Sequence, residues 1–198
     1  MEDFETFEPI RLAIFVTGGG TNCENIINYF RFRNDVEIPI VVSSRPDAYA
    51  LVRAERLGIP ATTITRAELN ENPELVLNTV RGCDYIILAG FLPKVPEYLI
   101  AQFPNRIINI HPALLPKFGG KGMWGHHVHE AVKAAGETRS GITIHFVNAE
   151  LDEGEHIAQF SCELSPDDTP EQIADKVHEL EMRHFPMVID QVIKNNLL

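Results

Sequence analysis

An amide and an imidazole stand two residues apart in Asn109-Ile110-His111-Pro112, at the end of an apolar run. Residues two apart on a strand share a face, so Asn109 and His111 can point into one site. Pro112 restricts His111 to an extended or turn geometry. Such a pair can bind an oxyanion and move a proton. A polar strand end without a ligand has the same pattern, so both interpretations stay open.

A second candidate is the glycine turn Gly18-Gly19-Gly20-Thr21-Asn22, which follows an apolar run and precedes a helical pattern. Glycines let the backbone approach an anion, and a helix N-terminus offers unpaired N–H groups and a positive dipole end. The turn matches neither G-x-x-x-x-G-K-[ST] nor G-x-G-x-x-G, so a nucleoside triphosphate or dinucleotide is not favoured. The pattern predicts a phosphate site, or else a tight turn in which Thr21 or Asn22 caps the helix.

Two further groups of polar residues have roles that spacing alone leaves open. Asp152 precedes Glu153-Gly154 between two predicted strands, where turn aspartates are common, and spacing does not connect it to His111. The segment 119–129 contains His126, His127 and His129. A metal site is one interpretation of this cluster, but acidic or cysteine ligands do not complete it nearby. A glycine-hinged lid that carries Met123 and Trp124 is the other.

Alternating strands and helices must position these residues. We predict helices at 23–32, 47–57, 72–81 and 96–103 and strands at 11–16, 38–43, 61–65, 84–89 and 106–111. The strands are apolar throughout, which predicts a parallel sheet covered by helices on both faces. Strands at 142–147 and 156–164 alternate like antiparallel ones, and a long amphipathic helix at 169–194 contains Pro186.

We therefore predict an α/β fold of Rossmann-like type, with a mostly parallel central sheet and an antiparallel C-terminal extension. We predict a single domain, 1–198, in which residues 1–9 form a flexible tail. Open α/β sheets bind ligands at the carboxyl ends of their strands. The segments 17–22, 90–94 and 109–112 occupy three such ends, so we expect them to converge on one site.

The amino-acid composition indicates which binding partners and which cellular compartment to expect. The 198 residues are 44% hydrophobic and 23% charged, with a formal net charge of -11. This charge argues against a nucleic-acid partner, although a small phosphate can still bind locally. Apolar runs are too short to predict a membrane span. The acidic start lacks the features of a secretory signal, and the three cysteines are widely spaced, which predicts a cytoplasmic protein with reduced thiols.

Taken together, the motifs resemble the folate-dependent phosphoribosylglycinamide formyltransferase family from about residue 11 to residue 192. The motifs that carry the resemblance are TGGGTN from Thr17, LAGFLPKV from Leu88, NIHPALLPKFGG from Asn109, GITIHFVNAELDEG from Gly141 and LEMRHFP from Leu180. The Asn-x-His-Pro-x-Leu-Leu-Pro string with a later His-Phe-Val and Leu-Asp-x-Gly is highly specific.

The resemblance implies a formyltransferase fold and a role for each matching position. It implies catalysis by Asn109, His111 and Asp152, without a metal. It implies that the substrate, glycinamide ribonucleotide, binds at Gly20, Thr21, Asn22, Pro112 and Glu181. It implies that the co-substrate, 10-formyltetrahydrofolate, binds at Leu92, Pro93, Lys94, Val95, Asn148, Ala149, Glu150 and Leu151. The sequence departs from the family at Lys94, where the basic residue is shifted, at Asp152-Glu153-Gly154 and in the longer segment 119–129.

Other functions compete with formyl transfer to the ribonucleotide in purine synthesis. The nearest is another formyl-folate enzyme, such as formyltetrahydrofolate hydrolase or methionyl-tRNA formyltransferase. A resemblance to either of these families implies a longer protein with an added domain. A dinucleotide-dependent oxidoreductase fits the fold but requires the absent G-x-G-x-x-G. An inactive binding module is disfavoured because the trio is intact. The sequence leaves open whether the chain is a monomer or a homodimer.

Overall fold

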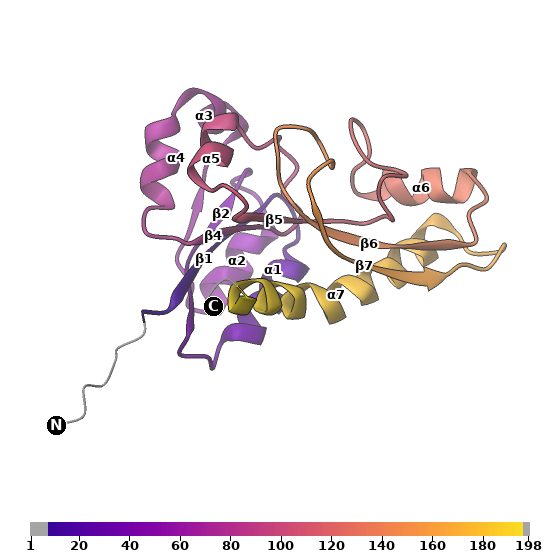
Figure 1. Cartoon of the computed structure of the whole chain (residues 1–198), viewed down its shortest axis with the longest axis horizontal. Helices are drawn as coiled ribbons and strands as arrows, with labels where there is room; N and C mark the ends of the chain where they lie inside the picture. Colours follow the sequence, from indigo (N-terminus) through magenta and orange to yellow (C-terminus); the bar gives the residue numbers. More distant parts are fainter. Residues whose placement is uncertain (1–7, 196–198) are drawn as a thin grey trace.

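The apolar runs form a seven-stranded sheet with helices on both sides (Figure 1). The computed structural model describes residues 8–195. Residues 1–7 of the predicted tail, 1–9, lie outside the described residues. The strand order is β3-β2-β1-β4-β5-β6-β7. The strand bounds are Ile10–Val16 (β1), Val36–Ser43 (β2), Ala61–Thr63 (β3), Tyr85–Leu88 (β4), Ile107–His111 (β5), Arg139–Phe146 (β6) and His156–Glu163 (β7).

Strand direction divides this sheet into two parts. Strands β1 to β5 pair in parallel, whereas β6 is antiparallel to β5, and β7 is antiparallel to β6. All four residues of β4 are buried, whereas the edge strand β7 has exposed residues along its length. A parallel strand is buried on both faces because helices cover both. The predicted α/β fold, with its mostly parallel sheet and antiparallel C-terminal extension, is confirmed.

Two apolar cores lie on opposite faces of the sheet. Ile87 contributes to the core beneath α1, α2, α6 and α7, and its neighbour Ile86 contributes to the core beneath α3, α4 and α5. The alternation follows from the two-residue period of a strand. The helix bounds are Thr21–Phe30 (α1), Tyr49–Arg56 (α2), Arg66–Glu71 (α3), Pro73–Thr79 (α4), Glu97–Gln102 (α5), His126–Ala134 (α6) and Pro170–Asn195 (α7).

Helix α7 is attached to α1 at the position of its internal proline. Pro186 has no N–H and therefore cannot bond the carbonyl of Met182, four residues earlier. That carbonyl accepts a hydrogen bond from the Asn25 side chain of α1 at 2.7 Å. The proline thus frees an acceptor that joins the two helices, and Glu181, the residue before Met182, lies beside the start of α1.

The structure differs from the predicted elements around residues 61–72. We predicted a strand at 61–65, but β3 ends at Thr63 because Thr65 begins a capping box with Glu68 at the start of α3. Helix α3 was not predicted, and its six residues carry too little periodicity to reveal it. Asn72, predicted as a helical residue, ends α3 and caps α4 through its side chain.

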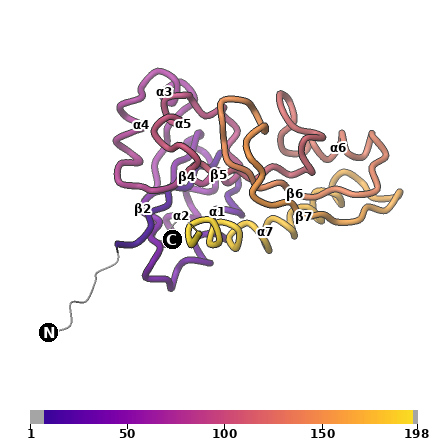
Figure 2. The backbone as a smooth tube through the Cα atoms, viewed as in Figure 1, coloured from indigo at the N-terminus to yellow at the C-terminus, as the bar shows by residue number. Residues whose placement is uncertain are grey.

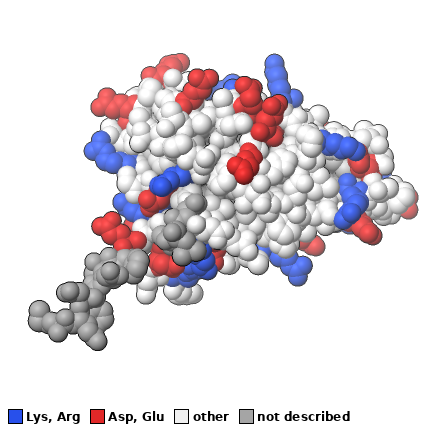
Figure 3. Space-filling view, viewed as in Figure 1, with Lys and Arg blue, Asp and Glu red and all other residues white. Residues whose placement is uncertain are grey.

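Charged side chains of both signs are visible on one face of the molecule (Figure 3). On the face shown in Figure 3, Lys and Arg side chains alternate with Asp and Glu around the periphery and do not form a continuous basic patch. Within residues 8–195, the helices lack an apolar stretch long enough to cross a bilayer. The long helix α7 runs beneath the sheet in the view of Figures 1 and 2, and its buried residues are mainly apolar.

We predict that Ile87→Ala lowers the free energy of unfolding by about 2–5 kcal/mol, because it leaves a cavity at the centre of the sheet. Ile87 is fully buried on β4, between β1 and β5. Val52→Ala, on the exposed side of α2, is the matched control and should change stability by less than about 0.5 kcal/mol. Urea denaturation of both variants measures the difference. Equal stability losses would contradict the position of Ile87 in the core.

Candidate active site

A cavity of about 950 Å³ opens where β1, β4 and β5 end, and Thr17, Gly90 and His111 line it. Strands β1 and β4 are neighbours although β2 and β3 lie between them in the chain, so the strand order reverses here, as it does at ligand sites of open α/β sheets. Hydrogen bonds join the two strand ends: Thr17 N donates to the Gly90 carbonyl at 3.0 Å, and Leu92 N donates to Thr17 Oγ1 at 2.9 Å. The predicted convergence of the three segments is therefore observed.

His111 lies at the floor of this cavity and is 4% exposed. Its Nε2 lies 2.7 Å from the Phe118 carbonyl, which can only accept, so Nε2 carries the hydrogen. Its Nδ1 lies 3.5 Å from Asp152 Oδ2. An imidazolium donates from both nitrogens, and the two neighbours of this ring, the Phe118 carbonyl and the Asp152 carboxylate, are both acceptors.

The segment after His111 is attached to the antiparallel strands by a buried hydroxyl. Thr143 Oγ1 donates to the Ala113 carbonyl at 2.7 Å and accepts from Leu115 N at 3.0 Å and Gln159 Nε2 at 2.8 Å. These three bonds use the full capacity of a hydroxyl. Thr143 is the cross-strand partner of His111, so the same strand pairing positions the imidazole and the loop that leads to Phe118.

Asp152 enters the site from the loop between β6 and β7. Its φ of 58° is left-handed, a conformation that Asp and Asn tolerate better than most residues. Its Oδ2 accepts a hydrogen bond from Gly120 N at 2.9 Å, which joins the two loops that lie side by side above the sheet (Figure 2). Asn148 stabilises this loop from within, because its side chain accepts from Glu150 N and donates to the Glu153 carbonyl.

Asn109 faces a histidine to which sequence reasoning assigned no role. His145 is its cross-strand partner, is 2% exposed, and places Nε2 3.1 Å from Asn109 Nδ2. Burial lowers the pKa of His145, although the Phe146 carbonyl and Asp152 oppose this effect. Thr143 and His145 are two residues apart within the predicted strand 142–147, but the pairing of this strand with β5 was not predicted.

The glycine turn leads directly into α1 and leaves its first N–H groups available. Gly20, with φ 78°, is the N-cap, and because it has no side chain it cannot accept a capping hydrogen bond from the N–H groups of the first turn. The predicted alternative, a cap by Thr21 or Asn22, is wrong because both residues are already helical. A Cβ at Gly20 would lie 2.5 Å from Ala50 Cβ, so glycine is required here for both the φ angle and the close approach of α2. The uncapped N–H groups fit an anion.

A polar network connects this turn to α7. Asn22 Nδ2 donates to Glu181 Oε2 at 2.8 Å, and His178 Nδ1 lies 3.1 Å from the same oxygen. The hydrogen bond to Glu181 raises the pKa of His178, which sequence reasoning did not identify. Asn22 Oδ1 is buried without a partner among the residues that the structure describes. The network therefore contains an unused buried acceptor, and Asn22 and Glu181 both line the cavity.

The mouth of the cavity combines exposed apolar side chains with cations. Large apolar side chains are rarely left exposed together, so such a group marks a binding surface. Leu92 is 52% exposed, Trp124 50% and Leu151 45%, and all three line the cavity. Basic residues at the same opening are Arg45, Arg66, Lys94 and Lys121.

Most of the predicted site residues line the cavity, but not all. The residues that line it are Asn22, Leu92, Pro93, Lys94, Val95, Asn109, His111, Pro112, Asn148, Glu150, Leu151, Asp152 and Glu181. Gly20, Thr21 and Ala149 do not line it. Gly20 acts through backbone geometry, Thr21 is exposed on α1, and Ala149 lies in the loop that presents Asp152.

The three histidines of the 119–129 segment face different surroundings. His126 lies 3.5 Å from Glu171, and His127 lies 3.1 Å from Glu130, both at the surface of α6. His129 is buried in the cavity wall, and burial lowers its pKa, although the Glu181 carboxylate opposes this. In residues 8–195 these side chains do not form a cluster of three or more metal-ligating groups.

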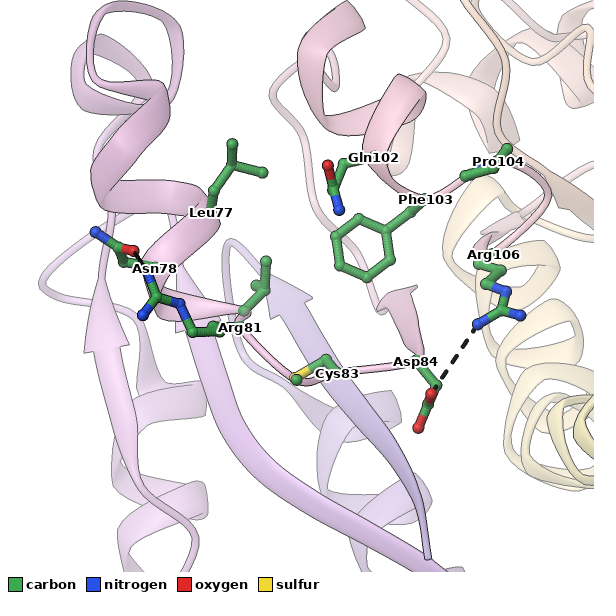
Figure 4. Close-up of a pocket in the computed structure, with 11 residues that line it drawn as sticks. Leu77, Asn78, Arg81, Cys83, Asp84, Gln102, Phe103, Pro104 and Arg106 are labelled. Carbon is green, nitrogen blue, oxygen red and sulfur yellow. Dashed lines mark hydrogen bonds and ion pairs between the residues drawn. The ribbon is translucent and has the colours of Figure 1, made fainter. Parts of the chain in front are cut away.

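A second cavity of about 530 Å³ lies at the opposite, amino-terminal edge of β4 and β5 (Figure 4). Leu77 and Phe103 face its interior, and Arg106 lies 4.0 Å from Asp84 across its rim. Burial raises the pKa of the Cys83 thiol to about 11, so this cysteine is not poised as a nucleophile. The chemistry-bearing residues gather in the first cavity.

Comparisons with known proteins agree with this site. A family model described as formyl transferase matches residues 10–189. A chloroplastic phosphoribosylglycinamide formyltransferase of Arabidopsis thaliana is 36% identical over 204 residues, covering 98% of this chain and 70% of the relative. A phosphoribosylglycinamide formyltransferase of Haemophilus influenzae is 32% identical over 186 residues, covering 90% of this chain and 85% of the relative. The crystal structure of the Anaplasma phagocytophilum enzyme of that name superposes with a TM-score of 0.86 at 30% identity, covering 95% and 89% of the two chains.

The fold and the cavity therefore define the chain as a formyl transferase, an enzyme that transfers a one-carbon group. Within that class, the chain belongs to the phosphoribosylglycinamide formyltransferase family. The resemblance stated from the motifs is confirmed, and the oxidoreductase and binding-module alternatives are wrong.

We predict that Gly20→Ala weakens binding of ribose 5-phosphate about tenfold or more, because the new Cβ must displace α2 from the turn. Stability should fall by about 1–3 kcal/mol from the strained φ angle. Titration calorimetry and urea denaturation measure the two effects. Gly136→Ala is the control, because Gly136 has φ 65° but open space around it, far from the cavity. It should lose stability alone, and equal loss of binding in both variants would disprove the role of the turn.

Proposed function

We propose that the chain transfers the formyl group of 10-formyltetrahydrofolate to the amine of glycinamide ribonucleotide, a step of purine synthesis. The observation that carries this proposal is the meeting of Asn109, His111 and Asp152 at the floor of a cavity that also reaches the uncapped N-terminus of α1. An oxyanion donor, an imidazole and a carboxylate suit acyl transfer, and the helix N-terminus suits a phosphate. The relatives carry the corresponding enzyme name.

The ribonucleotide fits the side of the cavity formed by α1 and α7. Its phosphate would accept hydrogen bonds from the backbone N–H groups of Gly20, Thr21 and Asn22. Its ribose hydroxyls would donate to the Glu181 carboxylate, which Asn22 holds at the cavity wall. Local N–H groups explain how a chain of net charge -11 can hold an anion.

The formyl-folate fits the other side of the cavity. Its flat ring system would lie against Leu92, Val95 and Leu151, which supply apolar contact area. The backbone around Asn148 and Glu150 offers hydrogen-bonding groups beside them. Lys94, which is displaced relative to the family pattern, is exposed at the rim, where it would face the carboxylates of the folate tail.

The three floor residues divide the chemistry between them. Asn109 donates a hydrogen bond to the formyl oxygen as the ribonucleotide amine attacks the formyl carbon and negative charge develops. His111, as an imidazolium, stabilises that charge, and the formyl oxygen takes the place of the Phe118 carbonyl at Nε2. Asp152 holds Nδ1 and helps to move the proton lost by the amine to the departing folate nitrogen. The bond from the formyl carbon to that nitrogen then breaks, without a covalent enzyme intermediate or a metal.

Two aspects of cellular context belong to the same proposal. We expect the chain in the cytoplasm, and the Arabidopsis thaliana relative is named as chloroplastic. We also expect a monomer or homodimer with small-molecule substrates and without a nucleic-acid partner. Cell fractionation and light scattering test these expectations directly.

We predict that the purified protein deformylates 10-formyl-dideazafolate only when glycinamide ribonucleotide is present. The absorbance change of the folate analogue measures turnover, and omission of the ribonucleotide is the control. Equal turnover with water as the acceptor would instead support the alternative, a formyltetrahydrofolate hydrolase.

We predict that Asp152→Asn lowers kcat by about 10²–10⁴-fold, with a smaller change in the ribonucleotide Kd. Asparagine tolerates the φ of 58° and can still accept from Gly120 N, so the loop should keep its conformation. The neutral asparagine side chain carries no negative charge, so it cannot stabilise a protonated His111 ring. Unchanged thermal melting is the control for folding.

A double variant tests whether Asp152 acts through His111. Asp152→Asn with His111→Ala should lose far less activity than the product of the two single losses, because the two residues form one unit. Losses that multiply would show that the two side chains act independently.

A further inference from the structure

His145 and Asn109 form a hydrogen-bonded pair at the floor of the cavity, beside the catalytic imidazole. They are direct partners across the antiparallel β5–β6 pair, so both side chains lie on the same face of the sheet. The separation between His145 Nε2 and Asn109 Nδ2 is 3.1 Å. Asp152 Oδ1 is the other polar neighbour of Nε2, at 3.8 Å, beyond hydrogen-bond distance. Nε2 is therefore bonded to Asn109.

The surroundings of the other ring nitrogen define the tautomer of His145. Nδ1 lies 2.9 Å from the Phe146 carbonyl, which can only accept, so Nδ1 carries the hydrogen. In a neutral ring Nε2 is then an acceptor, which matches the Asn109 NH₂ group. Burial keeps the ring neutral, although the Asp152 carboxylate opposes this and the rings of His111 and His156 assist it. The contacts of both ring nitrogens therefore fit a neutral His145 with its hydrogen on Nδ1.

This tautomer determines which end of the Asn109 amide faces the ring. An amide can rotate to exchange its oxygen and its NH₂ group, and only the NH₂ group can donate. Rotation would place Asn109 Oδ1 against the lone pair of His145 Nε2, two acceptors without a hydrogen between them. The observed orientation keeps the amide nitrogen at the floor, where one N–H binds His145 and the second is available to a ligand oxygen.

We infer that His145 is a positioning residue for formyl transfer, which holds the Asn109 amide so that an N–H faces the formyl oxygen. The inference rests on the proposed oxyanion role of Asn109. His145 acts through Asn109 and does not touch the reacting atoms.

The fold holds His145 itself by a close backbone contact. Strand pairing shifts register between Ile144 and His145, opposite β7. Gly154 passes directly over the Phe146 carbonyl, because a Cβ there would lie 1.6 Å from that oxygen and 3.4 Å from His145 Nδ1. Only glycine permits this approach. The loop that carries Asp152 thus also confines the carbonyl that fixes the His145 tautomer.

A matched pair of variants separates the acceptor from the bulk of the ring. His145→Gln keeps an acceptor near the position of Nε2, whereas His145→Leu removes it at similar size. We expect His145→Leu to lower kcat by about 10²–10³-fold, as loss of an oxyanion donor does, with little change in ribonucleotide KM. His145→Gln should retain at least tenfold more activity than His145→Leu. His184→Leu on α7, where the ring stacks on Phe160 outside the cavity lining, is the control and should keep wild-type activity.

A double-mutant cycle tests the route of the effect. Because His145 acts through Asn109, His145→Leu combined with Asn109→Ala should lose at most about threefold more kcat than Asn109→Ala alone. Multiplying losses, or equal activity of the Gln and Leu variants, would overturn the inference. If Asn109→Ala keeps full kcat, the proposed oxyanion role itself fails, which is a separate result.

The tautomer can be measured in the unmodified protein. Nitrogen-15 NMR of histidine-labelled wild type should show His145 as neutral, with the hydrogen on Nδ1 and none on Nε2, at neutral pH. The resonance is assigned by its loss in His145→Leu, or in His145→Gln if the leucine variant does not fold. An imidazolium, or a ring protonated at Nε2, would overturn the inference whatever the kinetics show.

Discussion

The reversal of strand direction between β5 and β6 is the constraint on which the site depends. A parallel neighbour would need a long crossover, and a helix would then cover this face of β5. The antiparallel neighbour instead places Thr143 opposite His111 and His145 opposite Asn109. Two loops cover the same face, one attached through Thr143 and the other carrying Asp152. The sheet therefore changes from a packed apolar layer to a polar floor within two strands.

Under the proposed function, the phosphate binds beside α1 and proton transfer occurs at His111, and helix α7 lines the first of these regions through Glu181. Pro186 leaves the Met182 carbonyl free to bond Asn25, which brings the adjacent Glu181 against Asn22 at the start of α1. The helix N-terminus can then attract a phosphate through its own N–H groups. This separation explains how an acidic surface and an anionic substrate are compatible, because the favourable potential is local to the first turn of α1.

The sequence predicted those features that depend on short-range patterns. The two-residue period placed Asn109 and His111 on one face. Apolar runs revealed β1 to β5 and alternating runs revealed β6 and β7, although β3 was made too long because Thr65 resembles a strand residue and acts as a helix cap. Asp152 could be assigned only by family resemblance, since a loop residue has no periodicity to orient it. The contacts of His145 and His178 were not predicted because they arise from strand register and helix docking, which single-sequence patterns do not specify.

Exclusion of water is the final requirement of formyl transfer, because water would compete with the amine for the formyl group. His111 is 4% exposed and His145 2%, so bulk water has little access to the floor. In this conformation the Phe118 carbonyl already accepts from Nε2 of His111, so this N–H is not offered to a water molecule. Phe118 belongs to the loop that Thr143 and Asp152 hold from either side, so the same contacts that build the floor also keep it closed. Under the proposed function, a formyl oxygen must displace a backbone carbonyl to reach the imidazole. Binding of the substrates can supply that displacement, whereas a single water molecule offers too few contacts to do so. The covering loop therefore keeps the imidazole N–H paired until a substrate carbonyl takes the place of Phe118.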